Sequence, residues 1–209
     1  YDIYPRSFHY FCEKKHRRER ALGAMRAKMK LLKDLGYFSG MQLTEKGNFA
    51  KKIYGYELSL SELYERGVLN AFSETELAVI LCALVFEPRK GSSRPPLNRD
   101  IRRLQGIADE TVRHVHRAER HLGITPFSKV YYFHLSPCIT AWMNNASFDE
   151  VVRLTDADEG GIVRYFRMTM QLMRELLDTP APLALKHKVK NTIVMMNRGV
   201  IDAEKQLRT

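Results

Sequence analysis

The stretch that most strongly decides the fold class is residues 146–177, ASFDEVVRLTDADEGGIVRYFRMTMQLMRELL. Ser147-x-x-Glu150 matches a capping box, in which a hydroxyl accepts from the third helical amide and the glutamate reaches back. Thr155-x-x-Asp158 repeats this signal of a helix start further along the chain. The stretch therefore predicts two consecutive helices in a helix-turn-helix arrangement, with Gly160-Gly161 in the first turn of the second helix.

The second of these helices carries a narrow polar stripe on an otherwise apolar surface. At roughly 100° per residue, the polar side chains fall within an arc of about 80°. They are Arg164, Arg167, Gln171 and Arg174. The opposite side is Ile162, Phe166, Met170, Met173 and Leu177, and the flanking positions are Tyr165, Met168 and Leu172. Because a solvated surface helix normally has a broad polar face, we predict that the stripe faces a bound polyanion. The alternative is that three arginines only extend to water from a central helix.

The chain on the N-terminal side of this stretch is also mostly helical by its pattern. Ser59-x-x-Glu62 and Ser73-x-x-Glu76 each match a capping box, and the second directly precedes the apolar run from Leu77 to Phe86. Residues 98–121 resume a helical pattern rich in arginine, with a predicted interruption near Gly106. These signals predict further helices of the same bundle.

The first quarter of the chain has the pattern of a helix followed by a hairpin. Residues 13–35 are predicted to form an amphipathic helix that ends at Gly36. Its apolar positions are Leu22, Met25, Met29, Leu32 and Leu35. Residues 37–47, with glycines at 40 and 47, indicate two short strands around a turn. We therefore predict a mainly α fold, a helical bundle preceded by a partial winged-helix segment with a short β-hairpin.

The composition indicates a globular protein with an anionic partner. The chain has 209 residues, 44% of them hydrophobic, and 34 Lys and Arg against 24 Asp and Glu give a net charge of +10. Such a basic chain attracts polyanions, and nucleic acid is the leading class. Three cysteines without a C-x-x-C pair, and no visible secretory leader, indicate a reducing, cytoplasmic location. The longest apolar run is too short to cross a bilayer, so no membrane partner is expected.

The sequence offers no motif for independent catalysis. There is no G-x-x-x-x-G-K-[ST] loop for nucleotide phosphates and no G-x-S-x-G elbow, so neither an ATPase nor a serine hydrolase is expected, and no catalytic residue is predicted. The histidines that cluster are His114, His116 and His121. Metal binding there is a minor alternative, because positions two apart do not share a helix face, and no metal site is predicted. Trp142 is predicted to pack in the core instead of stacking on a base.

Taken in order, these residues resemble a known family. The pattern around Trp142, Ala146-Ser147-Phe148 and Leu154-Thr155-Asp156, followed by Gly160-x-Ile162-Val163-Arg164-x-Phe166-Arg167, resembles the DSHCT domain at the C-terminus of superkiller, Mtr and HelY helicases. Upstream, the residues from Gly55 to Cys82 resemble the opening helices of the same domain. Residues 21–53 resemble the end of the winged-helix module that precedes it.

The resemblance implies an organisation for the whole chain. Residues 55–209 are expected to form the DSHCT helical bundle, with an exposed loop near 87–97, and residues 20–54 the end of the winged-helix module. Residues 1–19 form an unassigned basic segment, and the return of an inserted stalk is one interpretation.

The resemblance also implies a function. In that family the domain packs on the two RecA-like motor lobes of the same chain and closes a channel around single-stranded RNA, touched by a ratchet-like helix. The matching helix carries Arg164, Arg167 and Gln171, with Arg174 one turn further, and departs from the family pattern at Met168 and Met170.

The expected function is therefore an accessory domain of an ATP-dependent RNA helicase that contacts single-stranded RNA or DNA. No cofactor is expected for this chain, whereas ATP and Mg²⁺ are expected in the parent helicase. The alternative is a free-standing helix-turn-helix regulator that binds duplex DNA.

Overall fold

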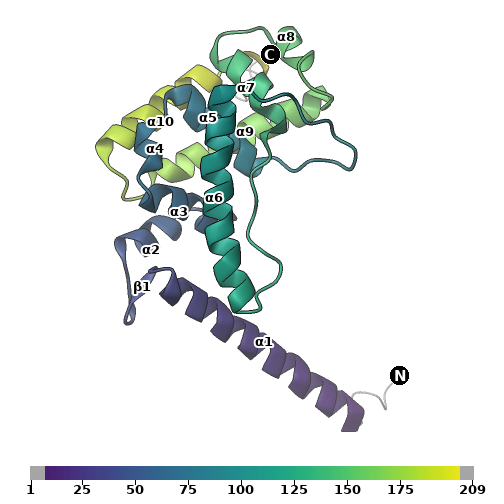
Figure 1. Cartoon of the computed structure of the whole chain (residues 1–209), viewed down its shortest axis with the longest axis vertical. Coiled ribbons are helices and arrows are strands. Elements are labelled where there is room, and N and C mark those ends of the chain that lie inside the picture. Colours follow the sequence, from purple (N-terminus) through teal and green to yellow (C-terminus); the bar gives the residue numbers. More distant parts are fainter. Residues whose placement is uncertain (1–7, 203–209) are drawn as a thin grey trace.

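The computed structural model describes residues 8–202 and contains, within them, ten α-helices and one two-stranded hairpin. The elements in chain order are α1 (Phe8–Asp34), β1 (Phe38–Ser39), β2 (Gln42–Leu43), α2 (Glu45–Ala50), α3 (Glu57–Glu65), α4 (Val68–Ala71), α5 (Glu74–Val85), α6 (Arg99–His121), η2 (Phe133–Leu135), α7 (Ser136–Met143), α8 (Phe148–Val152), α9 (Glu159–Leu177), α10 (Leu183–Met196) and η3 (Gly199–Ile201). The predicted mainly α class with a short hairpin is confirmed. In Figure 1, α1 projects from a bundle formed by the later helices.

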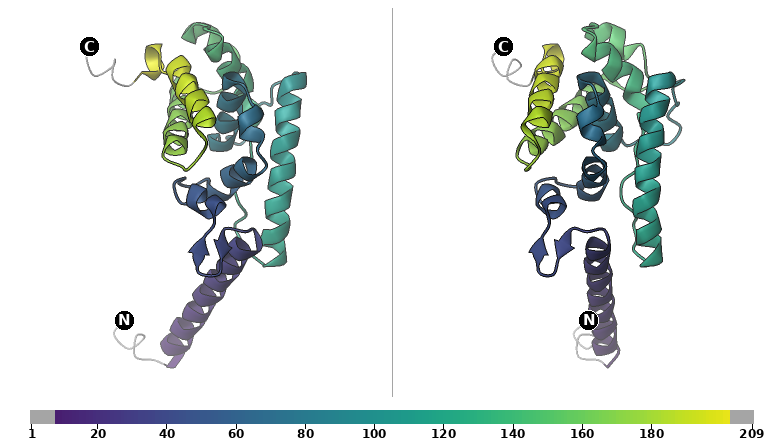
Figure 2. Two further views of the ribbon diagram at one scale, coloured as in Figure 1. Left: turned by 90° about the vertical axis from the view of Figure 1, so that its left-hand side faces the viewer. Right: turned by 60° about the vertical axis from the view of Figure 1, so that its left-hand side comes forward.

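Helix α5 is the centre of the bundle. Ser73 caps it as predicted, because its hydroxyl accepts from the Glu76 amide while the Glu76 carboxylate accepts from the Ser73 amide. Every residue from Leu77 to Val85 is buried, and the helix packs against α6, α7, α9 and α10 (Figure 2). Since burying one large aliphatic side chain contributes about 1.5–3 kcal/mol, this run anchors the core.

Helix α1 is longer than the predicted 13–35 and differs from the expected packing. Residues 14–26 of this helix are all exposed, and its apolar Leu22, Met25 and Met29 are 39%, 58% and 41% exposed. The apolar positions exist, but the helix runs away from the bundle and nothing in residues 8–202 covers them (Figure 1). Of the unassigned segment 1–19, residues 1–7 lie outside the described residues, and the rest belongs to α1.

The predicted hairpin is confirmed between α1 and α2. Strands β1 and β2 are antiparallel, with Phe38 opposite Leu43 and Ser39 opposite Gln42. The turn is followed at once by α2, which Thr44 caps by accepting from the Gly47 amide. Gly47 is required by close approach, because a Cβ there would lie 2.3 Å from the carbonyl oxygen of Tyr37.

A buried ion pair joins this N-terminal part to the bundle. The Lys46 ammonium lies 2.6 Å from the Glu62 carboxylate and also donates to the Leu35 carbonyl oxygen at 2.9 Å. The Tyr37 hydroxyl donates to the same carboxylate at 3.0 Å, and burial, together with this neighbouring negative charge, raises the pKa of Tyr37. The predicted capping box at Ser59-x-x-Glu62 is therefore wrong. Helix α3 begins at Glu57, and Glu62 points to Lys46 instead of back to Ser59.

The long helix α6 follows an exposed loop, as predicted for residues 87–97. The predicted interruption near Gly106 is wrong, because α6 is continuous from Arg99 to His121. One glycine inside a helix costs about 0.5–1 kcal/mol relative to alanine. The buried side chains on either side of it, such as Leu104 and Ala108, pack on the bundle and offset that cost. No helix within residues 8–202 is both long and apolar enough to cross a membrane.

Candidate nucleic-acid interface

The two helices predicted around residues 146–177 are present as α8 and α9. Ser147 forms the expected capping box on α8, with its hydroxyl accepting from the Glu150 amide and the Glu150 carboxylate accepting from the Ser147 amide at 2.7 Å. These amide and hydroxyl contacts lower the pKa of Glu150. Helix α8 is short, and it holds its Val151 side chain fully buried beside α7.

The predicted cap at Thr155 is wrong, because α9 begins three residues later. Asp158 is the N-cap, and its carboxylate accepts from the Gly161 amide at 2.6 Å. The Thr155 hydroxyl instead accepts from the Ala157 amide, so Thr155 shapes the turn before the helix. The pKa of Asp158 is lowered first by the Gly161 amide and then by Arg89, whose guanidinium lies 2.7 Å away. Both contacts favour the charged carboxylate at the positive end of the helix.

The apolar side of α9 is buried, as its pattern predicted. It packs between α5 and α10, and its fully or nearly fully buried side chains include Ile162, Phe166 and Met173. Tyr165 and Leu172, predicted to flank the polar stripe, are buried as well. The helix therefore presents only one narrow side to solvent.

That narrow side holds the predicted stripe. Arg164, Gln171 and Arg174 are exposed, and Arg167 is half-buried. A hollow of about 410 Å³ on this side is lined by Arg164, Arg167 and Gln171, with Gly160, Val163 and Met168 between them. Arg174 lies one turn further along the helix and does not line the hollow. The structure thus brings three of the four predicted residues to one shallow, open surface.

Two arginines of the stripe also make contacts within the protein. The Arg167 guanidinium donates to the carbonyl oxygens of Ile201 and Val200 at 3.1 and 3.0 Å, so it holds η3 against α9. The Arg164 guanidinium donates to the Tyr165 hydroxyl at 3.1 Å, and that hydroxyl donates to the Glu87 carbonyl oxygen. Helical periodicity could not predict the Arg167 contacts, because their partners lie more than thirty residues away.

Trp142 packs in the core, as predicted. It is 1% exposed, and its indole N–H donates to the Met196 carbonyl oxygen at 3.0 Å. The Arg198 guanidinium lies 3.6 Å from the centre of the Trp142 ring and donates to the carbonyl oxygens of Trp142 and Ala146. Desolvation lowers the pKa of Arg198. These contacts hold the end of α10 against α7, so the role of Trp142 is structural.

His116 and two of the cysteines are engaged in structure or buried. His116 contacts the Ser128 carbonyl oxygen at 2.8 Å and stacks on Phe127. Burial raises the pKa of the Cys82 thiol to about 12 and that of the Cys138 thiol to about 11, which makes both poor nucleophiles. Within residues 8–202 no three His, Cys, Asp or Glu side chains are grouped so as to hold a metal ion.

Comparison with known families assigns the fold. The DSHCT (NUC185) domain family matches residues 40–204, which is more than half of the chain. The chain belongs to the DSHCT family. This match begins at the hairpin and includes the bundle with α9 and its polar stripe, so the domain that the sequence resembled is the one present.

Similar proteins are RNA helicases of the Mtr4 and Ski2 type. The chain is 24% identical over 189 residues to the ATP-dependent RNA helicase mtr4 of Schizosaccharomyces pombe, covering 86% of this chain and 17% of that protein. It is 24% identical over 199 residues to the exosome RNA helicase MTR4 of Mus musculus, covering 91% of this chain and 19% of that protein. It is 26% identical over 139 residues to the antiviral helicase SKI2 of Saccharomyces cerevisiae, covering 63% of this chain and 11% of that protein. The chain thus spans less than one fifth of these relatives.

Proposed function

We propose that this chain is the accessory nucleic-acid-binding part of an ATP-dependent RNA helicase, and that its α9 surface contacts a single strand. The observation that carries the proposal is the exposed polar side of α9, on a helix whose opposite side is buried in the bundle. Its direct contacts would be made by Arg164, Gln171 and Arg174. Arg167 stays in the set because it lines the same hollow, although it also donates to η3.

Charge supports a polyanionic partner for this surface. The chain carries a net charge of +10, and the three arginines of the stripe are aligned on one side of one helix. Arginine forms bidentate contacts with phosphate, and each neutralised phosphate releases counterions. A shallow, open surface with several arginines is therefore suited to the backbone of a flexible strand.

Motor chemistry belongs to other parts of the proposed parent protein. The chain contains no loop that could cradle nucleotide phosphates, so ATP and Mg²⁺ do not fit its own residues and would be held by RecA-like lobes. We propose that the bundle packs on those lobes and that α9 guides the strand as they open and close. The similarity to whole RNA helicases supports this context.

The test is a comparison of the purified chain's binding to single-stranded RNA and to duplex DNA. Fluorescence anisotropy with labelled strands of about 20 nucleotides, across about 0.05–0.3 M salt, measures affinity and its salt slope. Tighter binding to the single strand is expected. Tight, sequence-selective binding to the duplex, without binding to the single strand, would instead support the alternative of a helix-turn-helix DNA regulator.

A further inference from the structure

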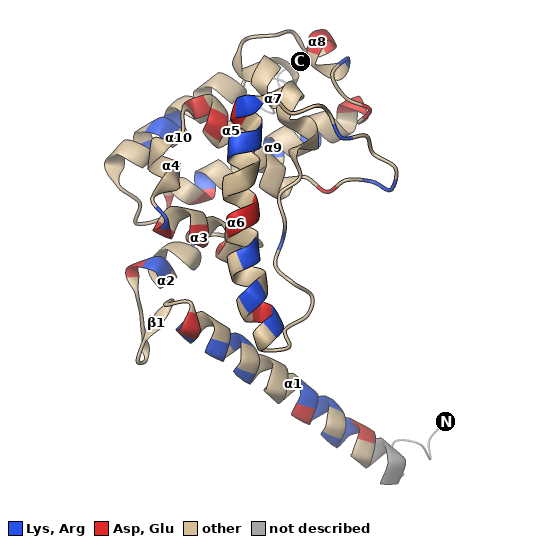
Figure 3. Ribbon diagram, in the orientation of Figure 1, with Lys and Arg blue, Asp and Glu red and all other residues tan. Residues whose placement is uncertain are grey.

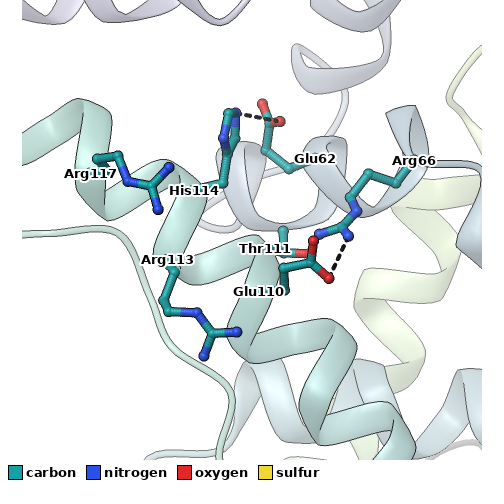
Figure 4. A pocket seen from close by; sticks show the side chains of 7 residues that line it. All are labelled: Glu62, Arg66, Glu110, Thr111, Arg113, His114 and Arg117. Atoms are coloured by element: carbon teal, nitrogen blue, oxygen red, sulfur yellow. Dashed lines mark hydrogen bonds and ion pairs between the residues drawn. The ribbon is translucent and has the colours of Figure 1, made fainter.

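A second basic surface lies between α3 and α6. It is a hollow of about 410 Å³, in which acidic and basic side chains alternate (Figure 4). The lining residues are Glu62, Arg66, Glu110, Thr111, Arg113, His114 and Arg117. The hollow lies on the C-terminal half of α6, which stands apart from α9 in the views of Figures 1 and 2. It is therefore separate from the polar stripe of α9.

Both acidic groups of this hollow already have cationic partners. Glu62 is paired with the Lys46 ammonium at 2.6 Å, where both side chains are buried, and the His114 ring nitrogen lies 3.9 Å from its other oxygen (Figure 4). Glu110 is paired with the Arg66 guanidinium at 2.8 Å, and Arg66 also donates to the Thr111 hydroxyl at 3.2 Å. Arg66 is the main reason that the pKa of Glu110 is lowered. Arg113 adds to this effect on Glu110 more weakly than Arg66 does, so Glu110 compensates Arg113 only in part.

Arg113 and Arg117 are those remaining cations. They are one turn apart on α6, and both are exposed. Among residues 8–202, no carboxylate lies within ion-pair distance of either guanidinium, and no dashed line reaches Arg113 or Arg117 in Figure 4. Like charges four residues apart destabilise a helix by about 0.2–0.5 kcal/mol. An anion bound between the two would remove that repulsion.

The surroundings favour a long anion over a single one. The C-terminal end of α6 lies beside the C-terminal part of α1 in all three views, and α1 carries exposed lysines at 28, 30 and 33. Figure 3 shows Lys and Arg along α1 and on the neighbouring half of α6. Basic side chains in the hollow, with more on the neighbouring end of α1, suit a chain of phosphates better than a single one.

We propose that the hollow between α3 and α6 is a second phosphate site for single-stranded nucleic acid, with Arg113 and Arg117 contacting successive phosphates. Arg66 and His114 form the walls of the site. This inference rests on the proposed function, because it takes the strand that α9 binds and gives it a second contact on another surface. Such a contact would increase the number of nucleotides that the protein contacts and would leave the contacts at α9 unchanged.

The test compares two double variants of the same helix. Arg113→Gln/Arg117→Gln removes the proposed contacts, and Arg99→Gln/Arg102→Gln removes the same charge from the exposed N-terminal end of α6. The probe is a labelled oligouridylate of about 20 nucleotides, titrated across about 0.05–0.3 M salt. Each neutralised phosphate contributes about 0.7 to the slope of log affinity against log salt for a single strand. Loss of two contacts therefore lowers this slope by about 1.4 and weakens binding about 25-fold at about 0.1 M salt.

The control double variant is expected to change affinity by less than about threefold, because distant charges are screened at these salt concentrations. Equal effects of the two double variants would overturn the second site. Poly-glutamate carrying the same total charge as the RNA is added as a competitor. If it displaces RNA from the wild type but not from Arg113→Gln/Arg117→Gln, the hollow binds acidic protein, and the second site is overturned. Failure of the wild type to bind RNA would contradict the proposed function itself, whereas sensitivity to α9 substitutions only would contradict just the second site.

Discussion

Replacing Lys46 by Met removes the cation that faces Glu62 but keeps a side chain of similar length between α2 and α3. The Glu62 carboxylate would then remain buried, at 4% exposure, with the Tyr37 hydroxyl at 3.0 Å as its nearest donor. The Leu35 carbonyl oxygen would also lose the ammonium that donates to it at 2.9 Å. Removing one partner of a buried ion pair costs about 3–5 kcal/mol, so Lys46→Met is expected to lower the free energy of unfolding by that amount.

Urea unfolding of the purified chain, followed by far-ultraviolet circular dichroism, measures this loss. Lys52→Met is the matched control, because Lys52 is exposed just after the same helix and its loss is expected to change stability by less than about 0.5 kcal/mol. Lys46→Met/Glu62→Leu is expected to recover part of the loss, since no unpaired charge stays buried. A loss below about 1 kcal/mol for Lys46→Met would refute the reasoning that this pair joins the hairpin segment to the bundle.

Three further predictions concern single residues. Gly47→Ala is expected to lower the melting temperature, because its Cβ would lie 2.3 Å from the Tyr37 carbonyl oxygen, whereas Gly106→Ala, with open space around it, is expected to raise stability by about 0.5–1 kcal/mol; calorimetry that ranks them the other way would contradict both. Arg167→Ala is expected to cost about 1–3 kcal/mol through its two lost carbonyl contacts, so urea unfolding unchanged from wild type would contradict its role at η3. Because the folded pKa of Asp158 is lowered, its contribution is present above the ordinary carboxyl pKa and is lost as pH falls; the stability difference between wild type and Asp158→Asn should therefore shrink below about pH 4, and a difference that grows there would contradict the cap.

Sequence patterns predicted those elements whose signals are local. The capping boxes at Ser73 and Ser147 were both correct. Glu76 keeps its cap although it also pairs with Arg103 of α6, because one carboxylate oxygen accepts from the Ser73 amide and the other faces the guanidinium. The same pattern failed at Ser59, since Lys46 from another element takes the Glu62 carboxylate. A capping pattern predicts only which local amide the glutamate can accept from. It does not predict a contact with a buried cation from another helix, such as Lys46.

The candidate site was predicted only in part, because local patterns do not show contacts between distant parts of the chain. Helical periodicity placed Arg164 and Gln171 on one exposed side of α9, and the structure brings them to one hollow. It could not show that Arg167 also binds η3, because that contact joins distant parts of the chain. Nor did it distinguish Arg113 and Arg117 from the other arginines of α6, since the neighbouring acids are paired with cations from other helices.

The central claim is that the polar side of α9 contacts a single strand, and its most direct test is the salt slope of RNA binding by Arg164→Gln/Arg174→Gln. Both residues are exposed, so the fold is expected to survive, and Lys51→Gln/Lys52→Gln removes the same charge from another exposed surface. The account predicts that the α9 variant lowers the slope by about 1.4 while the lysine variant leaves it nearly unchanged. A slope equal to that of the wild type in the α9 variant would contradict the claim and leave the stripe as surface charge.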